Sequence, residues 1–324
     1  MSPRTLAHRP RNTAAPQPDA AAVPASAQKA DPPRPKDPGA GPTTRLLKQH
    51  VRNLFRHLPL AVAGGQDPVH QMRVAARRLR VALPLLCRKA GGKRVRRAVR
   101  LVRDLTRGGG GSRDLDVIAG LLEARLEQAS SAELKVLVRD LRSARTRSRE
   151  RLAGDLLDVD IARLRRDLAT ITARRGVPTP SALRRLGTAV TRAKSEVLET
   201  LDGLGGTFDP PRLHRVRSRF RWLRYAAELA DALGERDSGA PAELRRVQVC
   251  LGSLHDAFVL SLWLERKAAR AEAAGRPQVA QCARLERDCA LDLAGVHHRE
   301  FLAMDPRALL ARGVEATAVP LSVG

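Results

Sequence analysis

The chain has 324 residues, enough for one large or two small domains with a substantial buried core. It carries 59 Lys and Arg against 34 Asp and Glu, a formal net charge of +25. This balance opposes compaction and favours a polyanionic partner: nucleic acid, an acidic membrane surface or polymeric phosphate. Phe, Trp and Tyr number only 5, 2 and 1, which disfavours a single-stranded nucleic-acid binder that stacks bases on aromatic rings.

Residues 1–43 are rich in Pro and Ala and have no apolar periodicity, so we expect a disordered tail there. From residue 44 onward apolar residues recur at intervals of three and four, which predicts an all-α domain over 44–312. Residues 313–324 are expected to form a C-terminal tail. The expected helices span 44–62, 67–90, 93–108, 112–128, 131–152, 158–173, 179–202, 209–234, 240–254, 255–274, 276–303 and 306–312.

The cysteines predict neither a zinc site nor a disulfide framework. Cys87, Cys250, Cys282 and Cys289 lie in helical patterns with no C-x2-C pair, so we expect buried, reduced thiols. The chain has no run of about 18 apolar residues and no hydrophobic segment near its N-terminus. We therefore expect a cytoplasmic protein that does not insert into a membrane.

Two basic segments repeat one pattern. "VHQMRVAARRLR" (69–80) aligns with "LHRVRSRFRWLR" (213–224), and each follows an Asp-Pro pair that predicts a helix start, with Asp as the cap. The matching positions are His70 with His214, Arg73 with Arg217, Arg77 with Arg221, and Arg80 with Arg224.

A second pair of segments follows the basic helices. "GGSRDLDVIAGLL" (110–122) aligns with "GSLHDAFVLSLWL" (252–264), and both Gly and Asp stand in register. We interpret the glycines as turns. The order of basic helix, Gly turn and Asp-headed helix therefore occurs twice, which predicts two homologous all-helical halves, about 44–175 and 178–312.

On a helical wheel, His70, Arg73, Arg77 and Arg80 share one arc opposite the apolar face. A solvated face with i,i+4 ion pairs is the alternative, but no acid lies between Asp67 and Asp104 to supply partners. Guanidinium groups present planar donors that match phosphate oxygens, and histidine with a pKa near 6.5 adds a neutral or a charged donor. Two such rows would line a groove for a phosphate polymer.

The residues beside the glycines have two interpretations. Asp114 and Asp256 would act either as helix N-caps or as partners that orient an Arg or His of the rows. Arg113 and His255 occupy equivalent places and would add donors. Asp116 has no acidic counterpart, because Phe258 stands at its offset.

The sequence does not predict an enzyme. "GGGG" (108–111) lacks the Lys and Ser or Thr of a phosphate-binding loop, and the His-x2-Arg segments lack metal-hydrolase spacing. We expect no catalytic residue, no metal ligand and no cofactor.

The segments "VHQMRVAARRLRVALPLL", "RDLDV", "LHRVRSRFRWLRYAAELA" and "LGSLHDA" resemble the signature segments of the CHAD domain, the conserved-histidine α-helical domain. The resemblance covers about residues 44–310. It implies two antiparallel four-helix-bundle-like halves with pseudo-twofold symmetry around a basic groove, which binds inorganic polyphosphate, and association with polyphosphate granules in bacteria. Trp222 departs from the pattern, which commonly has a basic residue there.

The residues that the resemblance assigns to polyphosphate are His70, Arg73, Arg77, Arg78, Arg80, His214, Arg217, Arg221 and Arg224, with Arg113, Asp114, His255 and Asp256 in support. No E-x-E-x-K signature of the triphosphate-tunnel domain that often accompanies CHAD is present, so the chain resembles a stand-alone member. A general polyanion-binding or nucleic-acid-binding protein is the alternative, and competition between polyphosphate and duplex DNA would separate the two.

Overall fold

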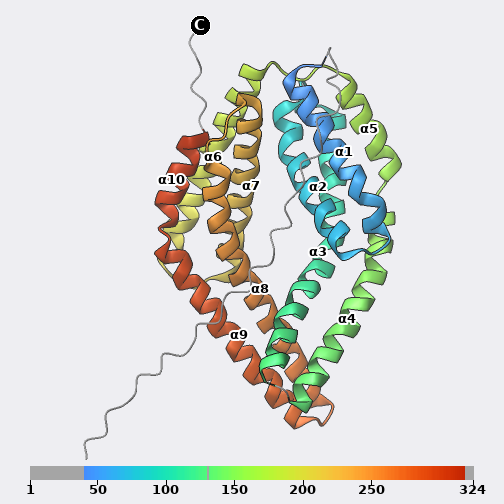
Figure 1. Cartoon of the computed structure of the whole chain (residues 1–324), viewed down its shortest axis with the longest axis vertical. Helices are drawn as coiled ribbons and strands as arrows, with labels where there is room; N and C mark the ends of the chain where they lie inside the picture. Colours follow the sequence, from blue (N-terminus) through green and yellow to red (C-terminus); the bar gives the residue numbers. More distant parts are fainter. Residues whose placement is uncertain (1–39, 130, 318–324) are drawn as a thin grey trace, which may run out of the picture. The chain divides into compact units, whose positions relative to one another are not determined.

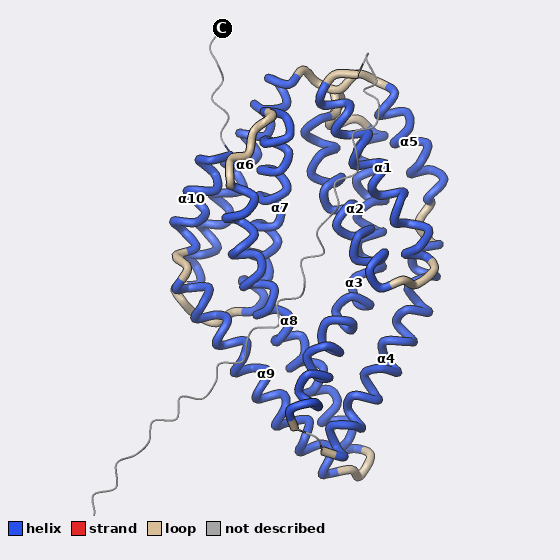
Figure 2. The backbone as a smooth tube through the Cα atoms, in the orientation of Figure 1, coloured by secondary structure: helices blue, strands red, loops and turns tan. Residues whose placement is uncertain are grey.

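The computed structural model describes residues 40–129 and 131–317. Within these ranges the chain forms only helices joined by short connections, so the predicted all-α class is confirmed (Figures 1 and 2). Residues 1–39 of the predicted tail lie outside the described residues. The helices are α1 (Pro42–Val62), α2 (Gln66–Leu86), α3 (Lys93–Gln128), α4 (Ala132–Leu157), α5 (Ile161–Ala173), α6 (Thr179–Leu204), α7 (Pro210–Gly234), α8 (Ala240–Ala273), α9 (Pro277–Ala303) and α10 (Pro306–Thr317).

The two predicted glycine turns are wrong, because each lies inside one long helix. The α3 helix runs unbroken through Gly108–Gly111, and α8 runs unbroken through Gly252. A glycine inside a helix costs roughly 1 kcal/mol relative to alanine, so tertiary packing overrides propensity here. Leu105 and Ile118 on either side of the α3 glycines are buried and keep the helix anchored.

The glycines instead lie beneath arginines of the basic helices. A Cβ atom at Gly110 would lie 3.6 Å from Nη1 of Arg73, and one at Gly252 would lie 3.7 Å from Nη2 of Arg217. The two repeated segments therefore contact each other in the same way in both copies, with a guanidinium resting on the backbone of the neighbouring long helix.

Helix ends differ from the expectations in two places. Asp209 caps α7, since its side chain accepts a hydrogen bond from the Arg212 amide at 3.0 Å, but Asp67 lies inside the first turn of α2 and Gly65 is the cap residue. The last helix continues to Thr317, whose side chain is buried, so residues 313–317 are helical.

The buried side chains form two clusters joined by α3 and α8. The larger cluster holds Phe220, Phe301 and Leu54, with residues from α1, α2, α5, α6, α7 and α10. The smaller one lies where the distal halves of α3 and α8 meet α4 and α9, around Leu122 and Leu264. Figure 1 shows α3 and α8 continuing from the larger group of helices into the smaller one.

The cysteines are free, as predicted, but not all are buried. Cys87 and Cys250 are buried, and burial raises the pKa of their thiols to about 12 and about 11. Cys282 is half-buried and Cys289 is exposed, which corrects the expectation for these two.

The α8 helix is long and apolar enough, by length and composition, to cross a bilayer. Half of its most apolar window is buried within the protein, where α8 packs against α7 and α9. The core helix of a water-exposed domain has the same properties, so the absence of membrane insertion stays a prediction.

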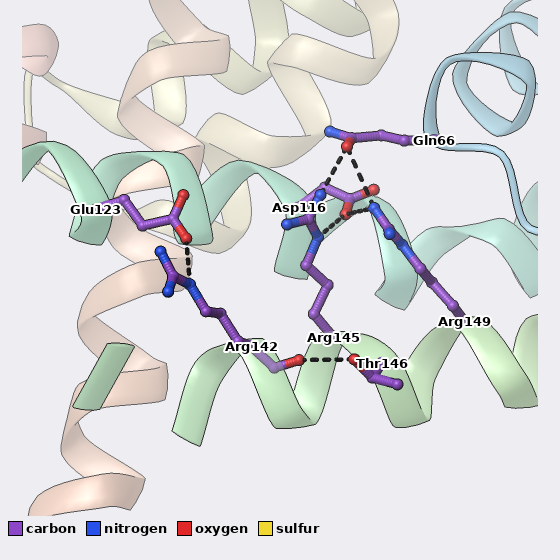
Figure 3. Close-up of polar contacts among 7 residues, drawn as sticks. All are labelled: Gln66, Asp116, Glu123, Arg142, Arg145, Thr146 and Arg149. Atoms are coloured by element: carbon purple, nitrogen blue, oxygen red, sulfur yellow. Dashed lines mark hydrogen bonds and ion pairs between the residues drawn. The ribbon is translucent and has the colours of Figure 1, made fainter. Parts of the chain in front are cut away.

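Asp116 clamps α4 onto α3. Its buried carboxylate accepts hydrogen bonds from Nε of Arg145 at 2.6 Å and from Nη2 of Arg149 at 2.9 Å, and both guanidiniums also donate to the Gln66 side chain (Figure 3). Charge-assisted hydrogen bonds of this kind are the strong ones. The carboxylate without a counterpart in the other repeat therefore has a structural role.

Asp116→Asn should lower the free energy of unfolding by about 1–3 kcal/mol, because two partly buried guanidiniums lose their counter-charge. Denaturant titration followed by circular dichroism measures this change. The matched control is Glu123→Gln, which removes the exposed α3–α4 pair with Arg142 and should cost less than about 1 kcal/mol. Equal losses in the two variants would contradict the clamp.

Candidate functional site

Helices α2 and α7 bring the two basic segments together. These helices pack on each other. Burial and then the charge of Arg77 lower the pKa of the Arg221 guanidinium. Burial and then the charge of Arg217 lower the pKa of the Arg77 guanidinium. Segments that lie far apart in the sequence thus present their cations to one shared volume.

The residues that influence one another electrostatically form what we call the central cluster. Its members come from four helices, α2, α3, α7 and α8. They are His70, Arg73, Arg77, Arg113, Asp114, His214, Arg217, Arg221, His255 and Asp256.

Arg73 is the most enclosed arginine of the α2 row. Its side chain is buried, with 8% of the residue exposed, and it donates a hydrogen bond to the Thr106 carbonyl on α3. Burial and the neighbouring charge of Arg77 lower its pKa to about 10, so it stays charged at neutral pH. Arg77, beside it, makes a side-chain hydrogen bond with Tyr225.

Arg78 and Arg224 share one carboxylate. Nε of Arg78 lies 2.8 Å from one oxygen of Glu228, and Nη1 of Arg224 lies 3.7 Å from the other. Both guanidiniums also stack over the Tyr225 ring, at 5.6 and 4.8 Å from its centroid. These two predicted site residues therefore join α2 to α7 and present less free charge than the central cluster does.

Arg80 borders the central cluster through Arg77. Burial lowers its pKa first, followed by the charges of Arg103, Arg77 and Arg107. It connects the α2 row to basic residues of α3 that the sequence did not single out.

Asp114 and Asp256 are not helix caps, because both lie inside continuous helices. Their charges act on the arginines instead: burial lowers the pKa values of Arg217 and Arg73, both carboxylates oppose this lowering at Arg217, and Asp114 also opposes it at Arg73. This geometry fits the second interpretation, in which the carboxylates orient the guanidiniums. Burial raises the pKa of Asp256 to about 6, against the opposing effect of Arg217.

The histidines of the cluster are neutral donors at pH 7. Burial, reinforced by nearby arginines, lowers the pKa of His70 and His214 and lowers that of His255 to about 4. The rings of His214 and His255 lie 4.7 Å apart between centroids. The value near 6.5 expected from the sequence is therefore too high.

Sequence analysis missed three contributors. Glu228 stands four positions after Arg224, so the pairing within α7 had a signal, but its contact with Arg78 depends on the tertiary fold. His50 of α1 is a neighbour of Arg78, and burial lowers its pKa to about 4. The Thr106 carbonyl carries no side-chain signal.

The central cluster suits an anion. Five arginines face two carboxylates, one of which has its pKa near 6. Within the described ranges, Nε of Arg217 is buried and has no hydrogen-bond partner. The same is true of Nε of Arg224, beside the cluster. Over the same ranges no three His, Cys, Asp or Glu side chains gather as metal ligands.

His255→Gln should reduce the acid sensitivity of the fold. Between pH 7 and pH 5 the unfolded chain protonates His255 near pH 6.5 while the folded protein, with its pKa of about 4, does not, so acidification destabilises the native state. This one residue accounts for about 2 kcal/mol at pH 5. Urea titrations at both pH values should show a smaller loss in the variant, and equal losses would refute the assignment.

Comparisons with known proteins agree with this architecture. An uncharacterized protein of Mycobacterium tuberculosis (strain CDC 1551 / Oshkosh), MT2285, is 26% identical over 253 residues, which are 74% of this chain and 48% of that protein. The chain thus spans about half the length of this curated relative. The crystal structure of the CHAD domain from the plant Ricinus communis has the same fold, with a TM-score of 0.57 and 23% identity over 85% of this chain and 91% of that one.

The sequence was also compared with models of protein families, which test sequence pattern rather than shape. The model of the CHAD domain matches residues 45–265, which is more than half of the chain. The protein therefore belongs to the CHAD-domain family.

Proposed function

We propose that this protein binds inorganic polyphosphate along the central cluster and does so without catalysing a reaction. One observation carries the proposal: α2 and α7 hold Arg73, Arg77, Arg217 and Arg221 so close together that, besides burial, neighbouring arginines lower the pKa values of Arg73, Arg77 and Arg221. A fold that keeps like charges together is stabilised by a polyanion. Membership of the CHAD family, whose resemblance implies polyphosphate binding, supports this ligand.

The chemistry of the cluster matches a linear phosphate chain. Arginines at i and i+3 or i+4 have Cβ atoms about 5–6 Å apart on one helix face, so several guanidiniums can each bind a different phosphate. The neutral histidines donate single hydrogen bonds to the same oxygens. Release of condensed counterions adds a favourable contribution that falls as salt rises.

The proposed site is a groove lined by both halves of a pseudo-twofold repeat. The equivalent contacts of Arg73 with Gly110 and of Arg217 with Gly252 support that symmetry. The polymer would lie across the junction of α2 and α7, with Asp114 and Asp256 behind the arginines. Symmetric lining suits a polymer without direction, such as polyphosphate.

The cellular setting follows from the ligand. A cytoplasmic protein that grips polyphosphate through one groove would accumulate on polyphosphate granules and coat, protect or organise the polymer there. This part of the proposal predicts co-localisation of the full chain with granules in cells.

Arg77→Glu together with Arg221→Glu should weaken binding of long polyphosphate by about 100-fold, because each lost charge-assisted hydrogen bond is worth ~1.5–3 kcal/mol. The new carboxylates lie beside Arg73 and Arg217, so the fold is retained. Fluorescence titration of labelled polyphosphate at about 0.15 M salt measures the affinity. The matched control, Arg266→Glu with Arg270→Glu, makes the same charge change at exposed positions of α8 that lack partners among the described residues.

Equal weakening in the control would show that net charge, not the central cluster, drives binding. Duplex DNA is the competitor in the same titration. DNA that displaces polyphosphate at equal phosphate concentration would replace the proposal with general polyanion binding. Orthophosphate release with any of several divalent ions would show an enzyme instead.

Arg221→Met should raise the stability of the protein without ligand and lower its affinity for polyphosphate. Removing one cation relieves its repulsion with Arg77 and Arg217, and each kcal/mol gained raises Tm by about 2–4 °C. Thermal unfolding should show a higher Tm than wild type without ligand and a smaller rise on adding polyphosphate. A lower Tm without ligand would show that the arginine stabilises the native fold.

A further inference from the structure

A second basic region lies outside the central cluster. A cavity of about 1000 Å³ opens between the end of α2, the start of α3 and the end of α5. Eight cations line it. Two of them are Arg97 and Arg163, and the other six are Arg88, Lys89, Lys93, Arg94, Arg174 and Arg175. All six are exposed, and none of them has a hydrogen-bonding or ion-pairing side-chain partner within the described ranges.

Among the residues that the structure describes, no carboxylate lines the cavity. The nearby acid, Asp167, is buried and already neutralised: Nε and Nη2 of Arg97 each lie 2.6 Å from one of its oxygens. This fork lowers the pKa of Asp167 and ties α3 to α5. The pair thus holds the cavity wall in place and leaves the six cations uncompensated.

The cations of this cavity are arranged differently from the rows of basic residues along α2 and α7. The six unpaired cations come from two separate segments, 88–94 and 174–175, and line one hollow. The floor contains Leu47, Val95 and Ile171, and the first turn of α3 begins at its edge without a side-chain cap. Convergent donors over a partly apolar floor suit a compact ligand rather than a long chain.

The cavity is also remote from the central cluster. Arg77 is the last residue of α2 in the central cluster, and Arg88 follows the end of that helix. A rise of 1.5 Å per residue separates the two positions by about 17 Å along the helix axis. The two regions have no residue in common, so either can be removed without the other.

We propose that this cavity is a second anion site, which binds a small ligand carrying two or three linked phosphate groups. Planar guanidiniums and ammonium groups around one hollow can each take a different phosphate oxygen. The inference does not depend on the central cluster binding polyphosphate.

The test uses the full chain carrying Arg77→Glu and Arg221→Glu, which removes the central cluster as a competitor. Tripolyphosphate and ATP, without divalent ions, are titrated by calorimetry at about 0.15 M salt. Adding Lys93→Glu and Arg94→Glu should weaken both ligands at least about tenfold, the effect of about 1.4 kcal/mol. Acidic residues favour the first turn of a helix, so α3 is preserved.

The matched control adds Arg266→Glu and Arg270→Glu to the same background and should leave both affinities unchanged. Equal affinities for tripolyphosphate and ATP would show that the phosphates account for binding. A higher affinity for ATP would show that the apolar floor also contributes, and either result supports the site. The proposal would be overturned if the protein with Arg77→Glu and Arg221→Glu bound neither ligand. It would also be overturned if the two added pairs of substitutions weakened binding equally. Failure of wild type to bind long polyphosphate would refute the proposed function and leave this result intact.

Discussion

Repulsion between the arginines of α2 and α7 is the constraint around which this protein is built. Burial and the charges of neighbouring arginines lower the pKa values of Arg73, Arg77 and Arg221, so the fold holds these cations together against their repulsion. The opposing contributions are buried apolar side chains on the other faces of α2 and α7, and Glu228, which pairs with both helices. The proposed binding surface and stability therefore oppose each other, as is common at functional sites.

The long helices α3 and α8 connect that surface to the rest of the molecule. Each passes beneath an arginine of the cluster at a glycine and then continues into the smaller apolar cluster with α4 and α9. The position of the guanidiniums is thereby set by helices anchored in two separate cores. The clamp at Asp116 adds a further polar attachment between α3 and α4.

Local pattern predicted much of this structure. Periodicity was sufficient for nearly every helix, and the repeated His and Arg positions predicted that two rows would act together, which their mutual pKa effects support. The glycines wrongly predicted turns, because intrinsic propensity is outweighed when buried residues such as Leu105 and Ile118 flank them. Contacts such as Arg78 with Glu228 join residues far apart in the sequence, so no local signal predicts them.

The raised pKa of Asp256 gives the cluster an adjustable charge. Because burial holds this carboxyl at a pKa of about 6 while His255 stays neutral down to about 4, the group that titrates in mildly acidic solution is the carboxylate and not that histidine. Each proton it takes up removes a negative charge from among the arginines. On mild acidification the cluster therefore gains net positive charge through the loss of this carboxylate's charge, without an imidazolium at His255.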